Sequence, residues 1–177
     1  MTILFIENRY KTFFLDEVVN HLQKEHDIHW IIQNKEFLPK NGEIHILKKP
    51  TKKIELTTKI DLKKIIESDR VVNYFQKKNL SYFNNYAIQI ETLIDKINPD
   101  FVFGESTLFH ELITIELCKQ KDILFLHPSS CRYPTNRFSF YLNDTVFPYL
   151  GSKEILCEDE ALKMIAIALI KLTKAWI

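Results

Sequence analysis

Short apolar runs alternate along this chain with longer segments in which apolar residues recur at helical spacing. The runs have the length and the β-branched or aromatic content of buried strands, and they cover residues 2–6, 28–32, 43–47, 101–103 and 123–126. Helical periodicity predicts helices at residues 13–26, 62–76, 82–97, 108–119 and 158–177. Strands separated by helices are typical of parallel βαβ units in one sheet. The pattern therefore predicts a three-layer, Rossmann-like α/β domain with a parallel sheet of about five strands in the order 3-2-1-4-5.

The length of 177 residues fits one domain with a sizeable core. We expect residues 1–157 to form the α/β domain and residues 158–177 to form a closing helix. That helix is apolar but interrupted by lysines, and it is too short and too charged to span a bilayer. Because it ends on Trp176 and Ile177 without a polar tail, we expect the natural chain to continue into a second domain.

Composition and terminal sequence exclude several classes of function. A net charge of +1 gives no support for nucleic-acid binding. Three cysteines without C-x-x-C or zinc spacing, and an amino terminus without signal-peptide features, predict a reducing cytoplasm. The chain has neither a G-x-G-x-x-G turn nor a P-loop signature, which argues against a dinucleotide-binding enzyme or an NTPase.

Residues 48–64 are rich in lysine. One interpretation is a basic patch that contacts phosphates or the acidic inner face of a membrane. The other is a solvated loop and helix face whose lysines are balanced by nearby acidic residues. The first would make the protein peripherally membrane-associated, and the sequence leaves both open.

Polar residues gather where three of the predicted strands end. In parallel sheets the carboxyl ends of the strands line the crevice in which ligands bind. The polar groups at these ends and in the loop after the fifth strand are therefore candidate substrate-binding residues: Glu7, Asn8, Arg9, Ser106, Thr107, His127, Ser129, Arg132, Asn136 and Arg137. The alternative for Glu7 and Arg9 is a surface ion pair.

Glu105 and His110 are the candidate catalytic groups. Glu105 directly follows a buried strand, a position that suits a general base. Its alternative role is to cap the following helix, beside Ser106 or Thr107. His110 lies one turn into that helix, close enough to share a site with Glu105 or to serve as a structural hydrogen bonder. Such a pair has too few ligands for a metal, so no metal site is predicted.

Two arginines in the segment 128–152 suggest an anion clamp. The guanidinium forks of Arg132 and Arg137 match phosphate or carboxylate bidentately. Their alternative is to pair with acidic neighbours such as Asp144 and hold the loop in place. Long loops without regular structure are usually functional. Ser129 and Ser130 lack a G-x-S-x-G elbow, so no hydrolase triad is predicted.

The segments GESTLFHE and ILFLHPSSCRYPTNRFSFYLND resemble the amino-terminal half of bacterial capsular and surface polysaccharide biosynthesis proteins. Those proteins are similar to GT-B glycosyltransferases, which pair two Rossmann-like domains across a cleft. The resemblance implies a domain that holds a glycan or glycolipid acceptor, with Glu105 or His110 as base and Arg132 and Arg137 as ligand contacts. It also implies that a nucleotide-sugar donor binds a second domain and that no cofactor is needed.

The leading hypothesis is thus the acceptor-side domain of a sugar transferase that makes capsule or another surface glycan. The alternative is a non-enzymatic flavodoxin-like domain that binds a small anionic ligand or a partner protein. A third hypothesis is a nucleotide-sugar-modifying enzyme that uses the Arg132 loop.

Overall fold

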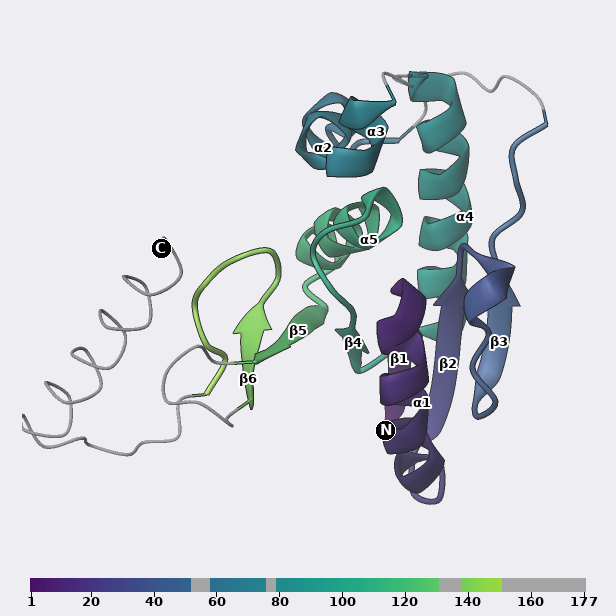
Figure 1. The fold of residues 1–177 in the computed structure, drawn as a ribbon, viewed down its shortest axis with the longest axis vertical. Helices are drawn as coiled ribbons and strands as arrows, with labels where there is room; N and C mark the ends of the chain where they lie inside the picture. The colour runs from purple at the N-terminus through teal and green to yellow at the C-terminus, as the bar shows by residue number, and fades with distance from the viewer. Residues whose placement is uncertain (52–57, 76–78, 131–137, 151–177) are drawn as a thin grey trace, which may run out of the picture.

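The computed structural model describes residues 1–51, 58–75, 79–130 and 138–150 (Figure 1). The predicted closing helix and any domain beyond it lie outside these residues. In chain order, the helices and strands are β1 (Thr2–Ile6), α1 (Arg9–Leu22), β2 (Asp27–Ile32), the 3-10 helix η1 (Lys35–Phe37), β3 (Glu43–Ile46), α2 (Leu62–Ser68), α3 (Arg70–Tyr74), α4 (Leu80–Ile97), β4 (Phe101–Phe103), α5 (Phe109–Gln120), β5 (Leu124–Ser130) and β6 (Phe138–Leu142).

The strands form one sheet in the order β3-β2-β1-β4-β5-β6. The first five are parallel, and Phe5 of β1 pairs with Trp30 of β2 on one side and with Phe103 of β4 on the other. This confirms the Rossmann-like α/β class and the predicted order of those five strands. The sixth strand pairs antiparallel with β5.

The expectation of an irregular loop over residues 128–152 was wrong for residues 128–130 and 138–142, which belong to strands. The predicted strand over residues 123–126 stopped before Pro128, but β5 continues through it. The pairing of β5 with β4 ends at Leu126, so only β6 flanks β5 at Pro128. A proline, which lacks an N–H, is tolerated where one side of a strand is unpaired. The aromatic run that follows then forms β6, in keeping with the strand preference of such residues.

Helices cover both faces of the sheet, which gives three layers (Figure 1). Alternate residues along a strand point to opposite faces. Ile3 and Phe5 of β1 pack with Leu15 and Val19 of α1. On the other face, a larger cluster joins β1, β4 and β5 to α2, α3, α4 and α5. The chain between β3 and β4 thus supplies most of the second helical layer.

The predicted single helix over residues 62–76 is divided in two at Asp69. The side chain of Asp69 caps α3, because its Oδ1 accepts hydrogen bonds from the backbone of Val71 at 2.7 Å and Val72 at 2.9 Å. Its Oδ2 accepts from the backbone N–H of Phe109 at 2.7 Å. Asp69 is buried, and its carboxylate bonds to the first turns of α3 and α5. Because Asp69 starts a new helix as its cap, α2 ends at Ser68.

α1 covers only part of its face of the sheet. A groove of about 390 Å³ is left beside it, between apolar side chains of α1 and those of β1, β4, β5 and β6. Phe14 and Phe140, which line this groove, are exposed. Among the described helices, none has the length and hydropathy of a membrane span.

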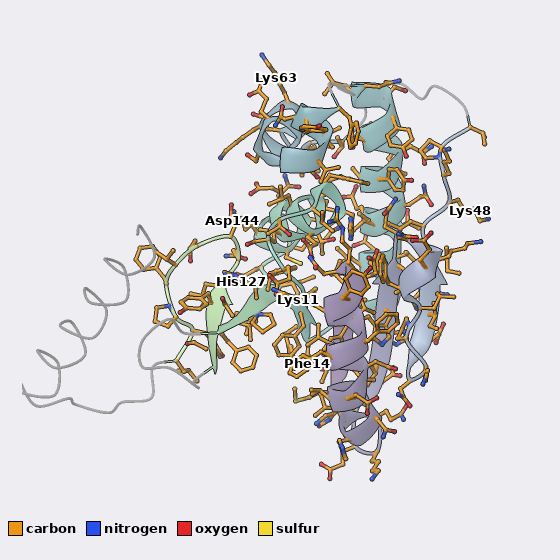
Figure 2. All side chains as sticks on the ribbon, viewed as in Figure 1. Lys11, Phe14, Lys48, Lys63, His127 and Asp144 are labelled. Atoms are coloured by element: carbon orange, nitrogen blue, oxygen red, sulfur yellow. The ribbon has the colours of Figure 1, made fainter. Side chains whose placement is uncertain are left out.

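The lysine-rich segment does not form one patch in the described residues. Lys48 follows β3, whereas Lys63 lies on α2, and the two are well separated in Figure 2. A basic surface that contacts a membrane therefore stays a prediction.

Candidate functional site

The strand order reverses between β1 and β4. The connection from β1 to β2 places α1 on one face, and the connection from β4 to β5 places α5 on the other. Loops at the carboxyl ends of these two strands diverge at such a switch point and leave a crevice where ligands bind in open α/β sheets. The loop after β1 carries Glu7 and Asn8, and the loop after β4 carries Gly104 and Glu105.

Gly104 allows the second of these loops to leave the sheet. A Cβ at this position would lie 3.0 Å from Ile6 Cβ and 3.0 Å from Phe125 Cζ, on the neighbouring strands. Real Cβ atoms rarely come that close, so a side chain here would displace the core. The backbone N–H of Gly104 donates to the carbonyl of Leu126 at 3.2 Å, which keeps the loop against β5.

Glu7 is a buried carboxylate that holds backbone rather than facing solvent. Its Oε1 accepts from the N–H of Arg9 at 2.8 Å, and its Oε2 accepts from the N–H groups of Gln33 and Asn34 at 3.2 and 3.0 Å. Glu7 therefore ties the end of β2 to the start of α1. The carboxylate is not on the surface, so the suggested surface ion pair with Arg9 was wrong.

Arg9 itself has a φ of 42°, in the left-handed region that side chains rarely adopt. The hydrogen bond from its N–H to Glu7 helps to hold that conformation.

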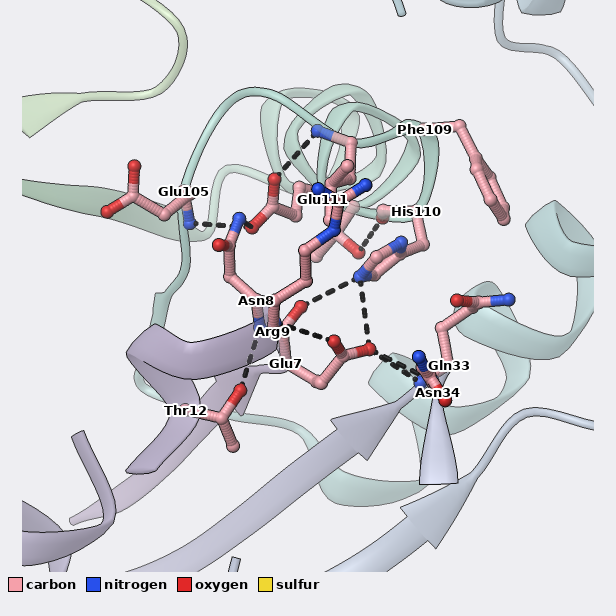
Figure 3. Close-up of polar contacts among 12 residues, drawn as sticks. Glu7, Asn8, Arg9, Thr12, Gln33, Asn34, Glu105, Phe109, His110 and Glu111 are labelled. Carbon is pink, nitrogen blue, oxygen red and sulfur yellow. Dashed lines mark hydrogen bonds and ion pairs between the residues drawn. The ribbon is translucent and has the colours of Figure 1, made fainter. Parts of the chain in front are cut away.

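Glu111 organises the β4–α5 loop, as Figure 3 shows. Its Oε1 accepts from the N–H of Glu105 at 3.1 Å and from the side-chain amide of Asn8 at 2.7 Å. Its Oε2 accepts from the N–H groups of Thr107 and Leu108 at 3.0 and 2.8 Å and from the Thr107 hydroxyl at 3.3 Å. This buried side chain, rather than Glu105, is the carboxylate that satisfies the open N–H groups before α5.

His110 is buried below this loop, with 1% of its surface exposed. Its Nε2–H donates to the backbone carbonyl of Glu7 at 2.8 Å and lies 3.7 Å from Glu7 Oε2. Its side chain and that of Glu105 point in different directions in Figure 3, although the two residues are close in sequence. The structure therefore joins His110 to Glu7.

Glu105 is paired instead with Lys11, on the first turn of α1. Lys11 Nζ lies 2.7 Å from Glu105 Oε1, and the two side chains are 58% and 11% exposed. Among the described residues, no backbone N–H donates to the Glu105 carboxylate, in contrast to the carboxylates of Glu7 and Glu111. Glu105 thus differs from Glu7 and Glu111, because its carboxylate pairs with a lysine side chain rather than with backbone N–H groups.

Ser106 lines a cavity of about 220 Å³. The cavity is bounded by α2, by α5 and by the turn after β6, and its lining is Asp61, Lys64, Ile65, Ser68, Ser106, Leu112, Glu116 and Asp144. Three of the lining residues are carboxylates and one is a lysine. An unpaired anion would be repelled here unless it neutralised Lys64.

Lys119 forms ion pairs with two of those carboxylates. Its Nζ lies 2.8 Å from Glu116 Oε1 and 2.8 Å from Asp144 Oδ1. Burial alone would lower the pKa of Lys119, but the hydrogen bonds to Asp144 and Glu116 outweigh it and raise that pKa. Burial would raise the pKa of Asp144, yet its bond to Lys119 leaves the pKa lowered.

Two other predicted ligand contacts pair with β6. His127 Nδ1–H donates to the carbonyl of Asn143 at 2.6 Å, and its ring stacks on Tyr141. Ser129 pairs with Ser139 across the strands. These interactions stabilise the antiparallel pair, and a ligand-binding role for either residue stays a prediction. Arg132, Asn136 and Arg137 lie outside the described residues.

The structure thus joins Asn8 and Thr107 to Glu111 and His110 to Glu7. It places Glu105 beside Lys11. Sequence reasoning did not single out Lys11 or give Glu111 a role. Lys11 does carry one signal, because it falls on the first helical turn after β1, at the same sheet edge as Glu105.

No protein-family model matches this chain, and no curated protein matches it. Its chain trace is similar to that of the UDP-GlcNAc 2-epimerase from Methanocaldococcus jannaschii, with 15% identity and a TM-score of 0.44, over 73% of this chain and 31% of that one. For the UDP-GlcNAc 2-epimerase from Neisseria meningitidis bound to UDP-GlcNAc, the identity is 14%, the TM-score 0.44 and the coverage 73% and 32%. For the calicheamicin glycosyltransferase CalG4, the identity is 16% and the TM-score 0.41, over 71% of this chain and 31% of that one.

This chain spans less than a third of each of those three proteins. Their activities belong to chains more than three times as long as the part matched here. The fold class of this protein follows from its own sheet order and helical layers.

Proposed function

We propose that this chain is the acceptor-side domain of a GT-B-like sugar transferase that builds capsule or another surface glycan. The observation that carries the proposal is the position of Glu105. Its carboxylate stands at the switch point of the sheet and is not committed to backbone N–H groups, and its side chain is 11% exposed. The resemblance of the segments around Glu105 and Arg132 to surface-polysaccharide proteins supports the choice of a sugar as ligand.

In the proposed reaction Glu105 acts as the general base. It removes the proton from an acceptor hydroxyl while that oxygen attacks the anomeric carbon of the donor sugar. The bond from the anomeric carbon to the nucleotide phosphate breaks, and the phosphate leaves with the electron pair. The nucleotide sugar is a substrate, and the proposal places it on a second domain of the complete protein.

Lys11 and His110 receive positioning roles in this proposal. The ion pair from Lys11 holds the Glu105 carboxylate toward α1. The hydrogen bond from His110 to the Glu7 carbonyl fixes the end of β1, on which Asn8 is carried. Of the two residues predicted to be the base, Glu105 is favoured because its side chain is 11% exposed, whereas that of His110 is 1% exposed.

The acceptor is proposed to be an acidic or phosphorylated glycan, free or lipid-linked, at the cytoplasmic side of the membrane. Arg132, Asn136 and Arg137 follow β5 in the chain, and arginine forks suit phosphate or carboxylate groups. Ser106 and Thr107, at the start of the β4–α5 loop, are proposed to contact acceptor hydroxyls.

The decisive test is glycosyl transfer by the full natural protein, measured by mass spectrometry with nucleotide sugars and phosphorylated glycan acceptors. We expect Glu105→Gln to lower the turnover number about 10²- to 10⁴-fold, the usual contribution of a positioned base. Glu116→Gln, on the outer part of α5, is the matched control and should retain turnover. Retained turnover in Glu105→Gln would remove Glu105 from the role of base.

Ligand binding to the 177-residue chain tests whether this domain holds the acceptor rather than the donor. In ligand-observed NMR we expect phosphorylated glycan fragments to bind and nucleotide sugars not to bind, with the glycan signal lost in Arg132→Ala. Nucleotide-sugar binding to this chain alone would overturn the proposed division of labour. Absence of any binding would favour the hypothesis of a partner-binding domain.

A further inference from the structure

A cluster of histidines and carboxylates lies on β2 and β3, at the β3 edge of the sheet. His29 pairs in register with Glu43, and Ile31 pairs with His45. Residues two apart on a strand point to the same face, and register partners in a parallel sheet do so too. His29, Glu43 and His45 therefore project together from one face of the sheet.

The ligand atoms of these three side chains have the spacing of a metal site. His29 Nδ1 lies 3.0 Å from His45 Nε2 and 3.7 Å from Glu43 Oε2, while His45 Nε2 lies 3.6 Å from Glu43 Oε1. Ligand atoms that each lie about 2.0–2.1 Å from one zinc ion are themselves roughly 3.0–3.5 Å apart. Small side-chain rotations would bring all three onto one ion.

Asp27 prepares His29 for this role. The Nε2–H of His29 donates to Asp27 Oδ2 at 3.1 Å, so Nδ1 carries the lone pair and points toward His45. A metal-binding histidine almost always donates its other N–H to a carboxylate or carbonyl in this way. The hydrogen bond to Asp27 is a separate observation from the His29–His45 distance, and it leaves His29 Nδ1 free to coordinate a metal ion.

Burial favours a bound ion with open coordination positions. The side chains of His29 and His45 are only 11% and 10% exposed, whereas that of Glu43 is 61% exposed. The two imidazoles are therefore shielded from solvent, whereas the Glu43 carboxylate is in contact with it. An ion bound between them would have room for water as a further ligand. Imidazole nitrogens with a carboxylate suit zinc and other first-row divalent metals.

We propose that His29, His45 and Glu43 form a binding site for a divalent transition-metal ion of the zinc class. β3 is the edge strand of the sheet, and the ion would link it to β2. Without the ion the same side chains form a histidine–histidine hydrogen bond and two long ion pairs, so a purely structural cluster is the competing outcome.

The test uses the full chain, without a tag and stripped of metal, in a Cys131→Ser/Cys157→Ser background that removes two thiols able to bind zinc. Co²⁺ is added as a coloured probe, and visible absorption reports its coordination. We expect one Co²⁺ per chain, displaced by one Zn²⁺. Saturation with Zn²⁺ near 100 times its Kd should raise Tm by about 5–10 °C.

Single substitutions identify the ligands. Glu43→Gln changes an exposed side chain and should leave the metal-free fold intact, while it abolishes the Co²⁺ spectrum and the Zn²⁺ shift in Tm. His45→Gln should do the same. His21→Gln, on the exposed face of α1, is the matched control and should bind as the parent does.

Asp27→Asn tests the supporting contact and should weaken Co²⁺ binding about 10- to 100-fold without removing the spectrum. Failure of the parent chain to bind Co²⁺ or Zn²⁺ would show a histidine–histidine hydrogen bond only and overturn the proposal. Equal binding by the parent and by His45→Gln would overturn it as well.

Discussion

The side-chain amide of Asn8 donates a 2.7 Å hydrogen bond to Glu111 Oε1, across 103 positions of sequence. This contact joins the loop after β1 to the start of α5 at the switch point of the sheet. The Glu111 carboxylate also accepts hydrogen bonds from backbone N–H groups of the β4–α5 loop. The position of Glu105 therefore depends on a carboxylate that itself does not reach solvent.

We expect Glu111→Gln to lower the free energy of unfolding by about 1–3 kcal/mol, the cost of leaving buried donors without an acceptor. The new NH₂ group would face N–H groups that now donate to the carboxylate. Urea denaturation followed by circular dichroism measures the change. Glu116→Gln, on the same helix but half-exposed, should change stability by about 1 kcal/mol or less. Equal effects of the two substitutions would contradict the organising role of Glu111.

Gly104→Ala should destabilise the protein by about 1–3 kcal/mol through overpacking. The added methyl group would meet Ile6 and Phe125 at 3.0 Å, and both belong to neighbouring strands of the core. Thermal unfolding measures the effect, with Ser106→Ala in the same loop as the control. A stability equal to that of the parent would mean that the strands have room to separate.

Lys11→Met should lower turnover while it changes stability little. Lys11 is largely exposed, so loss of its pair with Glu105 should change the free energy of unfolding by only about 0–1 kcal/mol. If Glu105 is the proposed base, the turnover of the full protein should nevertheless fall, because the carboxylate loses the contact that orients it. Lys24→Met, at an exposed position after α1, should leave turnover unchanged. Unchanged turnover in Lys11→Met would remove Lys11 from the positioning role.

The thiol of Cys118 should be inert in the folded protein. Burial raises its pKa to about 12, so it stays protonated at neutral pH, and the thiolate is the reactive form. In a Cys131→Ser/Cys157→Ser background, we expect no reaction with a chromogenic disulfide reagent until denaturant is added. Rapid labelling under native conditions would show that α5 opens locally.

Hydrophobic patterning determined most of the fold. The apolar run over residues 2–6 predicted a buried strand, and the structure packs Ile3 and Phe5 on one face and Leu4 and Ile6 on the other. The order of the five parallel strands followed from the preferred hand of βαβ connections. β6 was missed because Pro128 resembles a strand end, and only the single-sided pairing of β5 at that residue makes the proline acceptable.

The candidate site was predictable as a place and not as a set of contacts. Polar residues after β1 and β4 indicated the crevice, because parallel strands bring their carboxyl ends to one edge. Which carboxylate is not held by backbone N–H groups was decided by packing. Glu7 and Glu111 are turned inward by backbone N–H groups, and Glu105 is turned toward Lys11.

The sequence by itself thus determined the layers, the order of the parallel strands and the edge at which polar groups collect, since these depend on local periodicity and chain connectivity. The tertiary structure alone decided the partners of each polar side chain. It joined Asn8 to Glu111 and His29 to His45. A hydrogen bond is a short, directional contact, so its partner is settled only when distant segments have packed to within a few ångströms of one another.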